Sequence, residues 1–272
     1  MVAQEITVYR HDFELLESAG SHDSSLCGYS LWSERGTAPL KANVSSPWHG
    51  RSIHWMDHGG IHVLKGSGVP YLPQPYRDTG ELPGYVWGGL RGDDALREWN
   101  ILKEAQFWGI RCPEPGAVFR YEFTVPPIPG NSFQYHGWLY RVESPYRLVD
   151  LEFLGQDGAR QLAEAIRNTG WEEEGLHLGL AHWLGATLGT VRKAGWFHNA
   201  VTTHNITLAL ELLDFEAAHR LDDASVDPDM RDALLAREQV HAMEVLYYVS
   251  FWLGEHFDVQ AAGAVLDEYL GR

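Results

Sequence analysis

An asparagine and an aspartate on either side of a short apolar hairpin form the most polar motif in an apolar part of the chain. Residues 195–216 read GWFHNAVTTHNITLALELLDFE, with Asn205 before the hairpin and Asp214 after it. The hairpin would bring an amide oxygen and a carboxylate together, and such oxygen ligands suit Mg²⁺, which one or two protein groups hold together with nucleotide phosphates. The alternative is that both residues simply cap a turn.

A lysine at the end of an apolar strand is the second candidate. Residues 61–65 read IHVLK, and Glu98 follows Lys65 by 33 positions, on the first helix that the sequence predicts. A lysine on a buried strand needs a carboxylate partner, because an unpaired buried charge is very costly. A strand lysine paired with a helix glutamate holds the nucleotide phosphates in protein-kinase folds, where an asparagine and an aspartate bind the metal. The alternative is an exposed lysine and a solvated glutamate.

Two arginines, Arg141 and Arg147, lie where the predicted strands give way to helices, in a chain with only 21 lysine and arginine residues. Arginine binds phosphate through two parallel N–H bonds and keeps its charge, so the two residues suit a polyphosphate clamp. Salt bridges to the abundant acidic residues are the alternative.

The elements that must position these residues change type along the chain. Short apolar segments between Gly, Pro, Asp and Ser predict strands at 6–9, 29–32, 52–56, 61–64, 118–125 and 134–142, with a hairpin turn at 57–60. Leu96, Trp99 and Leu102 recur at helical spacing after Asp93, the expected N-cap. Later periodicity predicts helices at 159–168, 176–192, 229–253 and 259–270, interrupted by a hairpin at 206–215.

We therefore expect an α+β, protein-kinase-like fold with two lobes. Residues 1–143 would form a strand-rich, nucleotide-binding N-lobe with one helix and the Lys/Glu pair. Residues 144–272 would form a reduced helical C-lobe that carries the catalytic and metal loop.

The motifs resemble those of the selenoprotein O family, kinase-fold proteins that transfer AMP to proteins. The family's catalytic segment, approximately GFVHGVMNTDNMSI followed by IDYG, aligns with residues 195–216 without a gap. Its motifs for the phosphate-binding lysine, the helix glutamate and the arginines match residues 64–71, 96–98 and 140–147, two of them with small gaps. Its Asp-Gly-Arg phosphate loop matches residues 49–51 most weakly. The motifs occur in family order across residues 46–216.

This resemblance implies an ATP- and Mg²⁺-dependent nucleotidyltransferase, with Mn²⁺ as an alternative metal. ATP would bind inverted relative to ordinary kinases, so that AMP moves to a hydroxyl acceptor. Lys65 and Glu98 would be the ion pair that grips the phosphates, and Asn205 and Asp214 would hold the metal. The residues implied to contact ATP are Gly50, Arg51, Lys65, Arg141 and Arg147.

Two positions depart from the family pattern. The family's aspartate before the asparagine, a candidate base for the accepting hydroxyl, is His204 here. A neutral imidazole accepts a proton near pH 7 but does not contribute the same negative charge. The glycine after the Asp-Tyr pair is Glu216, which adds a carboxylate beside the expected metal. The acceptor stays open between a protein, a peptide and a small molecule.

Three classes of function remain. The first is the AMP transferase, and the second is another ATP-using enzyme on this fold, either a phosphotransferase or an adenylate-forming ligase that acts on a small molecule or peptide. The third is a non-catalytic, nucleotide-binding pseudokinase, which the histidine at position 204 keeps open.

Composition narrows the partners. The net charge of −16 argues against a nucleic-acid surface, although it leaves room for a small cationic pocket. No stretch is long and apolar enough to span a bilayer, and the N-terminus lacks a signal-peptide pattern. Two cysteines allow one disulfide at most. We expect a cytoplasmic protein that contacts neither nucleic acid nor membrane.

Three other patterns receive a structural interpretation. His54, His58 and His62 have a zinc-like spacing, but the turn at 57–60 separates them, so a zinc site is the minor alternative. The glycines at 175, 179, 185 and 189 predict close helix packing, and the aromatic stripe at 246–252 predicts a core position.

Overall fold

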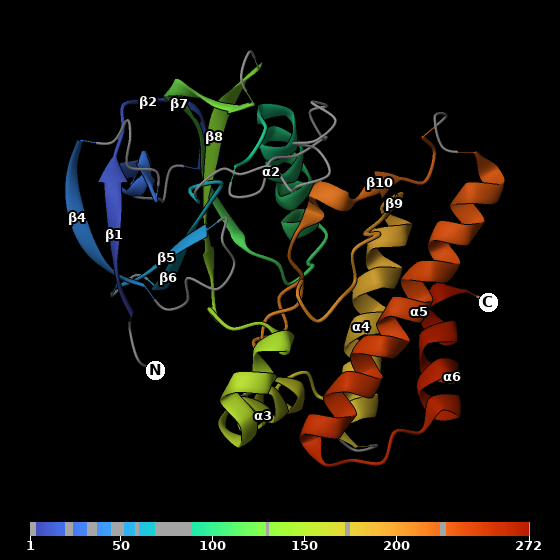
Figure 1. Ribbon diagram of the computed structural model, residues 1–272. Helices are drawn as coiled ribbons and strands as arrows, with labels where there is room; N and C mark the ends of the chain where they lie inside the picture. The colour runs from blue at the N-terminus through green and yellow to red at the C-terminus, as the bar shows by residue number, and fades with distance from the viewer. Residues whose placement is uncertain are drawn as a thin grey trace. The chain divides into compact units, whose positions relative to one another are not determined.

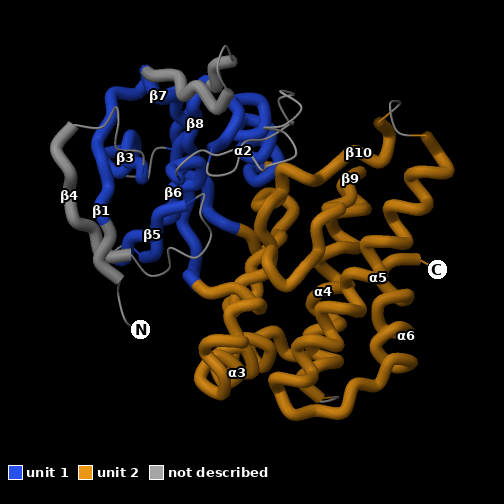
Figure 2. Tube along the Cα trace, viewed as in Figure 1, with its two compact units in different colours: residues 1–103, 113–145 blue, residues 104–112, 146–272 orange. Residues whose placement is uncertain are grey.

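The computed structural model describes residues 4–19, 24–31, 37–44, 52–57, 60–68, 89–128, 131–171, 175–223 and 227–271, without the side chains of 4–6, 37–44, 57, 123–128 and 131–133. Among these described residues, antiparallel strands and one helix occupy the first part of the chain, and helices dominate the second (Figure 1). The predicted α+β, kinase-like fold is therefore confirmed. The chain forms two compact units, which we call unit 1 (residues 1–103 and 113–145) and unit 2 (residues 104–112 and 146–272) (Figure 2).

The described residues of unit 1 form two antiparallel sheets. The larger has the order β2-β7-β8-β6-β5, formed by β2 (Phe13–Ser18), β7 (Glu114–Ile128), β8 (Asn131–Val142), β6 (Gly60–Lys65) and β5 (Ser52–Asp57). The smaller has the order β3-β1-β4, formed by β3 (Tyr29–Ser30), β1 (Gln4–Arg10) and β4 (Thr37–Val44). The predicted β5–β6 hairpin forms, with Asp57 opposite Gly60. Strands β2 and β4 were not predicted from the sequence.

Aromatic side chains fill much of the core of unit 1. Phe119, Tyr121 and Tyr135 are fully buried in one cluster on the larger sheet, and the Tyr121 and Tyr135 rings lie 5.2 Å apart. Trp138 on β8 is also fully buried and meets Trp99 edge to face, with ring centroids 6.4 Å apart. Large rigid rings bury much surface per residue, which explains part of the high tryptophan content.

The helix of the first half, α2 (Gly92–Phe107), places its apolar stripe inward as predicted. Ala95, Trp99 and Leu102 are buried along one face. The predicted N-cap at Asp93 is wrong by one or two residues, because the amide of Ala95 already donates to the carbonyl of Arg91. Asp93 lies in the first turn instead, where its charge still opposes the helix dipole.

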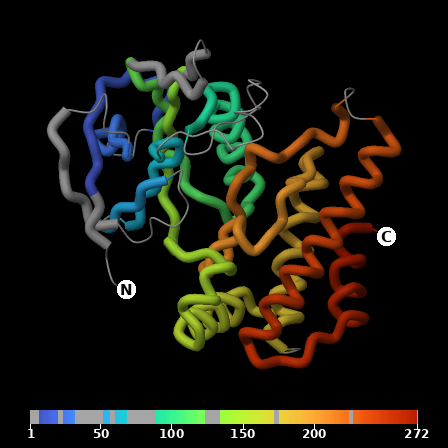
Figure 3. The backbone as a smooth tube through the Cα atoms, viewed as in Figure 1, coloured from blue at the N-terminus to red at the C-terminus, as the bar shows by residue number. Residues whose placement is uncertain are grey.

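The α-helices in the described residues of unit 2 are α3 (Leu151–Arg167), α4 (Leu176–Lys193), α5 (Pro228–Leu253) and α6 (Val259–Leu270). Helix α4 packs against both α5 and α6, and their path from yellow to red can be followed in Figure 3. Helix α3 begins eight residues before its predicted start and has a non-helical residue at Gly155. Within the parts that the structure describes, no helix is long and apolar enough to cross a membrane.

Two predictions about the helices have opposite outcomes. The glycines of α4 allow close packing, since a Cβ at Gly185 would lie 2.7 Å from the Tyr269 ring and one at Gly189 would lie 3.0 Å from the Tyr269 carbonyl. The aromatic stripe on α5 is wrong as a core prediction. Leu246 and Val249 are buried, but Tyr247 is 65% and Phe251 73% exposed, because helical geometry turns neighbouring residues to different faces.

Candidate functional site

The first candidate group lies in unit 1, where strand β6 meets helix α2. The Lys65 ammonium lies 2.9 Å from the Glu98 carboxylate, and the two residues are 4% and 2% exposed. Lys65 is the cross-strand neighbour of Trp138, so the two side chains share one face of the sheet. Trp138 contacts Trp99, the residue next to Glu98, which places α2 on the same face. The predicted partners therefore meet inside a tryptophan-lined layer.

Burial of this ion pair costs free energy of desolvation. Two charges out of water are costly unless geometry and further hydrogen bonds compensate, so a buried pair is by itself weak evidence for stability. An ion pair of this kind, between a strand lysine and a helix glutamate, positions nucleotide phosphates in protein kinases.

Arg141, one of the predicted phosphate contacts, lies on β8 in unit 1 and pairs with a carboxylate. Its guanidinium pairs with the Glu114 carboxylate, its cross-strand neighbour on β7, and the two side chains are 40% and 37% exposed. This contact matches the salt bridge that the sequence left as the alternative.

The second candidate group lies in unit 2, in the loop between β9 (Trp196–Phe197) and β10 (His219–Arg220). An isolated bridge between Ile206 and Leu212 closes a short hairpin. At its base the amide of Leu213 donates to the Asn205 carbonyl at 2.8 Å, so the chain returns to Asn205 immediately before Asp214. The predicted convergence of Asn205 and Asp214 therefore has a backbone basis.

The same loop concentrates backbone strain. Among the residues that the structure describes, the non-glycine residues with positive φ are Asn199, Leu210 and Asp214, at 61°, 60° and 58°. Each such residue costs of order 1 kcal/mol or more and persists only where its surroundings fix it. Strain of this kind clusters at functional sites.

His198 connects the beginning of the loop to its end. Its Nε2 lies 2.8 Å from the Leu213 carbonyl, and the Ala200 amide donates to its Nδ1 at 3.3 Å. These contacts assign the proton to Nε2 of a neutral ring. Complete burial lowers the pKa of His198, which favours the same neutral form. The ring also meets Phe215 edge to face at 4.8 Å, so one side chain holds both neighbours of Asp214.

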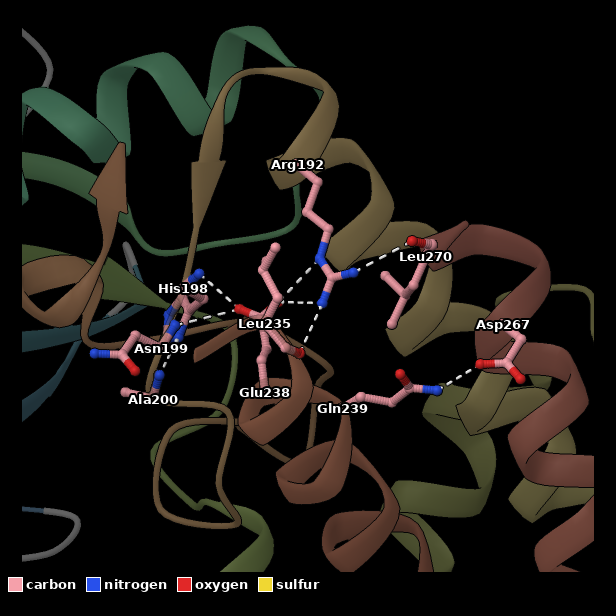
Figure 4. A network of polar contacts seen from close by, with 9 residues as sticks. All are labelled: Arg192, His198, Asn199, Ala200, Leu235, Glu238, Gln239, Asp267 and Leu270. Carbon is pink, nitrogen blue, oxygen red and sulfur yellow. Dashed lines mark hydrogen bonds and ion pairs between the residues drawn. The ribbon is translucent and has the colours of Figure 1, made fainter. Parts of the chain in front are cut away.

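Glu238 on α5 is a site residue that the sequence analysis missed. Its Oε1 accepts from the His198 amide at 2.7 Å and the Asn199 amide at 3.2 Å (Figure 4). Its other oxygen pairs with the Arg192 guanidinium at 2.9 Å, and Glu238 itself is 1% exposed. The signal was available: Glu238 falls on the apolar stripe that includes Ala242 and Val249, so helical spacing predicts a buried carboxylate.

The remaining predicted residues of unit 2 lie beside the same loop. His204 is exposed, and its backbone carbonyl accepts from the Arg147 guanidinium at 2.7 Å. The Arg147 amide donates to Asp150, a buried carboxylate whose pKa is raised by burial, against the lowering effects of Arg147 and His204. Arg147 and His204 are therefore brought together, although through the backbone of His204 rather than its imidazole.

Several other residues that the sequence singled out lie outside the described parts of the chain or in the core. Gly50 and Arg51 lie outside the described residues, as does His58 of the zinc-like trio. His54 is buried beside Ser52, with its Nε2 3.2 Å from the hydroxyl. In the described parts of the chain, no group of three or more His, Cys, Asp or Glu residues could hold a metal by itself. Both cysteines are free thiols.

The loop also has a kinase spacing that the sequence analysis overlooked. His198 precedes Asn205 by seven positions, as in the kinase motif H-R-D-x-x-x-x-N, and Asp214-Phe215-Glu216 corresponds to D-F-G. Ala200 then stands where kinases have the aspartate that accepts the substrate proton. By this spacing, Asn205 and Asp214 fall at the positions that bind metal in kinases, and Ala200 falls at the position of the kinase base.

No protein-family model matches the chain, and no curated protein does. It is similar to solved kinase-fold structures at low identity. A rhoptry antigen kinase domain from Toxoplasma gondii shares 13% identity over 89% of this chain and 80% of that one, with a TM-score of 0.43.

A Toxoplasma gondii virulence factor, ROP2, is described as having a protein-kinase fold and no enzymatic activity. It shares 12% identity over 96% of this chain and 78% of that one, with a TM-score of 0.46. WaaP in complex with acyl carrier protein shares 13% identity over 86% and 90%, with a TM-score of 0.36. The kinase-like features of the chain's own residues are the Lys65–Glu98 pair in unit 1 and, separately, the spacing from His198 to Asp214 in unit 2.

Proposed function

We propose that this chain binds ATP with Mg²⁺ and transfers AMP to a hydroxyl acceptor. The observation that carries the proposal is the buried Lys65–Glu98 pair at 2.9 Å. A buried lysine charge that is fixed by a carboxylate suits the phosphates of a nucleotide, as in protein kinases. Lys65 would hold the phosphates, and Glu98 would keep the ammonium in place and charged.

Asn205 and Asp214 fit a hard divalent cation. The Asn205 amide nitrogen donates to the Ala200 carbonyl at 2.9 Å, so its amide oxygen is the atom that would bind the metal. The Asp214 carboxylate supplies the negative charge. One amide oxygen, one carboxylate and nucleotide phosphates make a donor set that Mg²⁺ accepts, and Mn²⁺ shares this preference. The bound ion would neutralise phosphate charge during the transfer.

Ala200 favours AMP transfer over ordinary phosphorylation. An alanine at the kinase base position cannot accept the proton of a hydroxyl that attacks the γ-phosphate. His204, directly before Asn205 and exposed, offers an imidazole in a different place on the loop. The resemblance to the selenoprotein O family supports the same choice, because that family transfers AMP with its candidate base at this position.

The proposed reaction balances without a further reagent. The acceptor oxygen attacks the α-phosphorus, a new P–O bond forms, and the bond between the α-phosphorus and the bridging oxygen breaks to release pyrophosphate. His204 would take the hydroxyl proton. The acceptor itself is not identified by these residues, and a protein, a peptide and a small molecule all remain candidates.

Differently labelled ATP tests the proposal. We expect label from the α-phosphate, and none from the γ-phosphate, to enter an acceptor in a cell extract or the chain itself. Lys65→Ala and Asp214→Ala should abolish the transfer, while Arg160→Ala, which removes an exposed arginine of α3, should not. Transfer of γ-label would indicate a phosphotransferase, and AMP release with a carboxylate acceptor would indicate a ligase. Full activity in both site variants would contradict the site assignment.

A second function, nucleotide binding without catalysis, is favoured by one specific observation. The chain has Ala200 at the position of the kinase base, and the residue before Asn205 is His204 rather than a carboxylate. This pseudokinase function predicts Mg²⁺-dependent binding of ATP, measured by calorimetry, with transfer of neither label.

A further inference from the structure

A short segment after the last strand of unit 1 holds the loop of Asn205 by its main chain. The amide of Leu148 donates to the Ile206 carbonyl at 2.9 Å, and the amide of Val149 donates to the Thr203 carbonyl at 3.1 Å. In return, the amide of Leu208 donates to the Tyr146 carbonyl at 2.9 Å. Residues 146–150, all in unit 2, therefore act as a strap along residues 203–208.

One carbonyl in this turn depends on a side chain of the strap. Four consecutive carbonyls, from Thr203 to Ile206, each accept a hydrogen bond, and only that of His204 accepts it from a side chain, the Arg147 guanidinium at 2.7 Å. The backbone of Arg147 is fixed in turn, because its amide donates to the Asp150 carboxylate at 2.7 Å. Asp150 is 4% exposed, so this anchor is well packed.

We propose that Arg147 and Asp150 are positioning residues that fix the peptide between His204 and Asn205. This inference rests on the proposed function for the roles of those two residues, and on the structure for the contacts. A guanidinium on the His204 carbonyl orients the peptide that leads directly into Asn205. Hydrogen bonds to a charged donor are stronger than neutral ones, so Arg147 is well suited to hold a strained loop.

The inference assigns Arg147 a role different from the phosphate contact that the family resemblance implies. The two roles differ in when they act. A phosphate contact matters only when nucleotide is bound, whereas a positioning contact restrains the loop in the free protein as well. Amide hydrogen exchange of the full chain without nucleotide therefore separates them.

The experiment compares exchange at the amides of Asn205 and Leu213, which close the turn, between the natural chain and matched variants. We expect Arg147→Ala to accelerate exchange at both amides about tenfold, the scale of one lost charge-assisted hydrogen bond. Arg147→Lys, which keeps a charged donor, should recover part of the protection. Asp150→Ala should act as Arg147→Ala does, and Asp150→Asn should retain most protection because its amide oxygen still accepts from the Arg147 amide. Arg160→Ala is the matched surface control.

The second readout is the Mg²⁺-dependent affinity for ATP, measured by calorimetry on the same variants. We expect it to fall in Arg147→Ala and recover partly in Arg147→Lys. Unchanged exchange in the free Arg147→Ala variant would overturn the inference, and a loss of ATP affinity alone would indicate a direct phosphate contact. If the natural chain transfers no AMP, the proposed function fails, while the exchange result still decides the positioning role. If Arg147→Ala does not fold, Arg147→Lys and the two Asp150 variants give the same comparison.

Discussion

Unit 1 and unit 2 hold their candidate site residues by different means. In unit 1, Lys65 and Glu98 are joined side chain to side chain, inside a layer made by Trp99 and Trp138. In unit 2, main-chain hydrogen bonds hold Asn205 in place. The carboxylate of Glu238 on α5 accepts hydrogen bonds from two backbone amides at the start of the loop. The first arrangement depends on the identities of two residues, and the second on a network.

This difference predicts how each group responds to substitution. A pair of opposite charges can be removed as a pair, since an apolar replacement of both partners restores a neutral interior. A carboxylate that accepts several backbone amides has no such replacement, because the amides stay in place when it is removed. Substitutions in the unit 2 group should therefore lower the free energy of unfolding more than substitutions in the unit 1 group.

The largest effect is expected at Glu238. Glu238→Ala leaves the buried amide of His198 and the partly buried amide of Asn199 without their acceptor and Arg192 without its carboxylate, so the free energy of unfolding should fall by about 4–5 kcal/mol. Glu238→Gln keeps an acceptor for the amides and should lose about half as much. Urea denaturation followed by circular dichroism measures both. Glu244→Ala, an exposed change on the same helix, is the control and should stay within about 0.5 kcal/mol.

A smaller loss of stability, which a second substitution should largely restore, is expected in unit 1. Lys65→Met alone leaves the Glu98 charge buried without the ammonium that it pairs with and should cost about 3 kcal/mol. The double variant Lys65→Met with Glu98→Leu should recover to within about 1 kcal/mol of the natural chain, since both charges are gone. The same denaturation measurement applies. If the double variant were as unstable as the single one, the Lys65–Glu98 pair could not be replaced as a pair. The proposed difference in how the two units respond to substitution would then be wrong.

The sequence predicted the contacts of the unit 1 group more completely than those of the unit 2 group. The reason is again that side chains hold the first group and main-chain hydrogen bonds hold the second. A lysine at the end of an apolar strand must find a carboxylate, so residue types and spacing were enough to pair Lys65 with Glu98. Main-chain hydrogen bonds leave little trace in residue types, so the hold of residues 148 and 149 on the turn could not be predicted. Strands β2 and β4 were missed because their pairing is settled by distant partners rather than by local pattern.

The third prediction concerns the pH dependence of stability in the unit 2 group. Burial lowers the pKa of His198 below its ordinary value of 6.5, so the unfolded chain binds the proton more readily than the folded one. Stability from this group is therefore present above pH 6.5 and is lost as the pH falls below it, at no more than about 1.4 kcal/mol per pH unit. His198→Gln retains a donor toward Leu213 and cannot titrate.

The measurement is the midpoint of urea denaturation between pH 7.5 and 5, for the natural chain and His198→Gln. Because the two chains share every residue except the one at position 198, the informative quantity is the difference between their slopes. The natural chain should lose stability more steeply below pH 6.5. Equal slopes would mean that His198 does not remain neutral in the folded state.

The smallest effect is expected at Arg141, where the family resemblance and the observed contact lead to different outcomes. Its pair with Glu114 is partly exposed on both sides, so Arg141→Ala should change the free energy of unfolding by less than about 1 kcal/mol. We expect ATP affinity to stay within about twofold, because Glu114 already neutralises the guanidinium. Glu114→Ala is the matched variant: it releases the arginine and should strengthen ATP binding only if Arg141 reaches a phosphate. A tenfold loss of ATP affinity in Arg141→Ala would contradict this expectation. It would show that Arg141 contacts the phosphates and belongs to the same functional group of residues as Lys65 and Glu98.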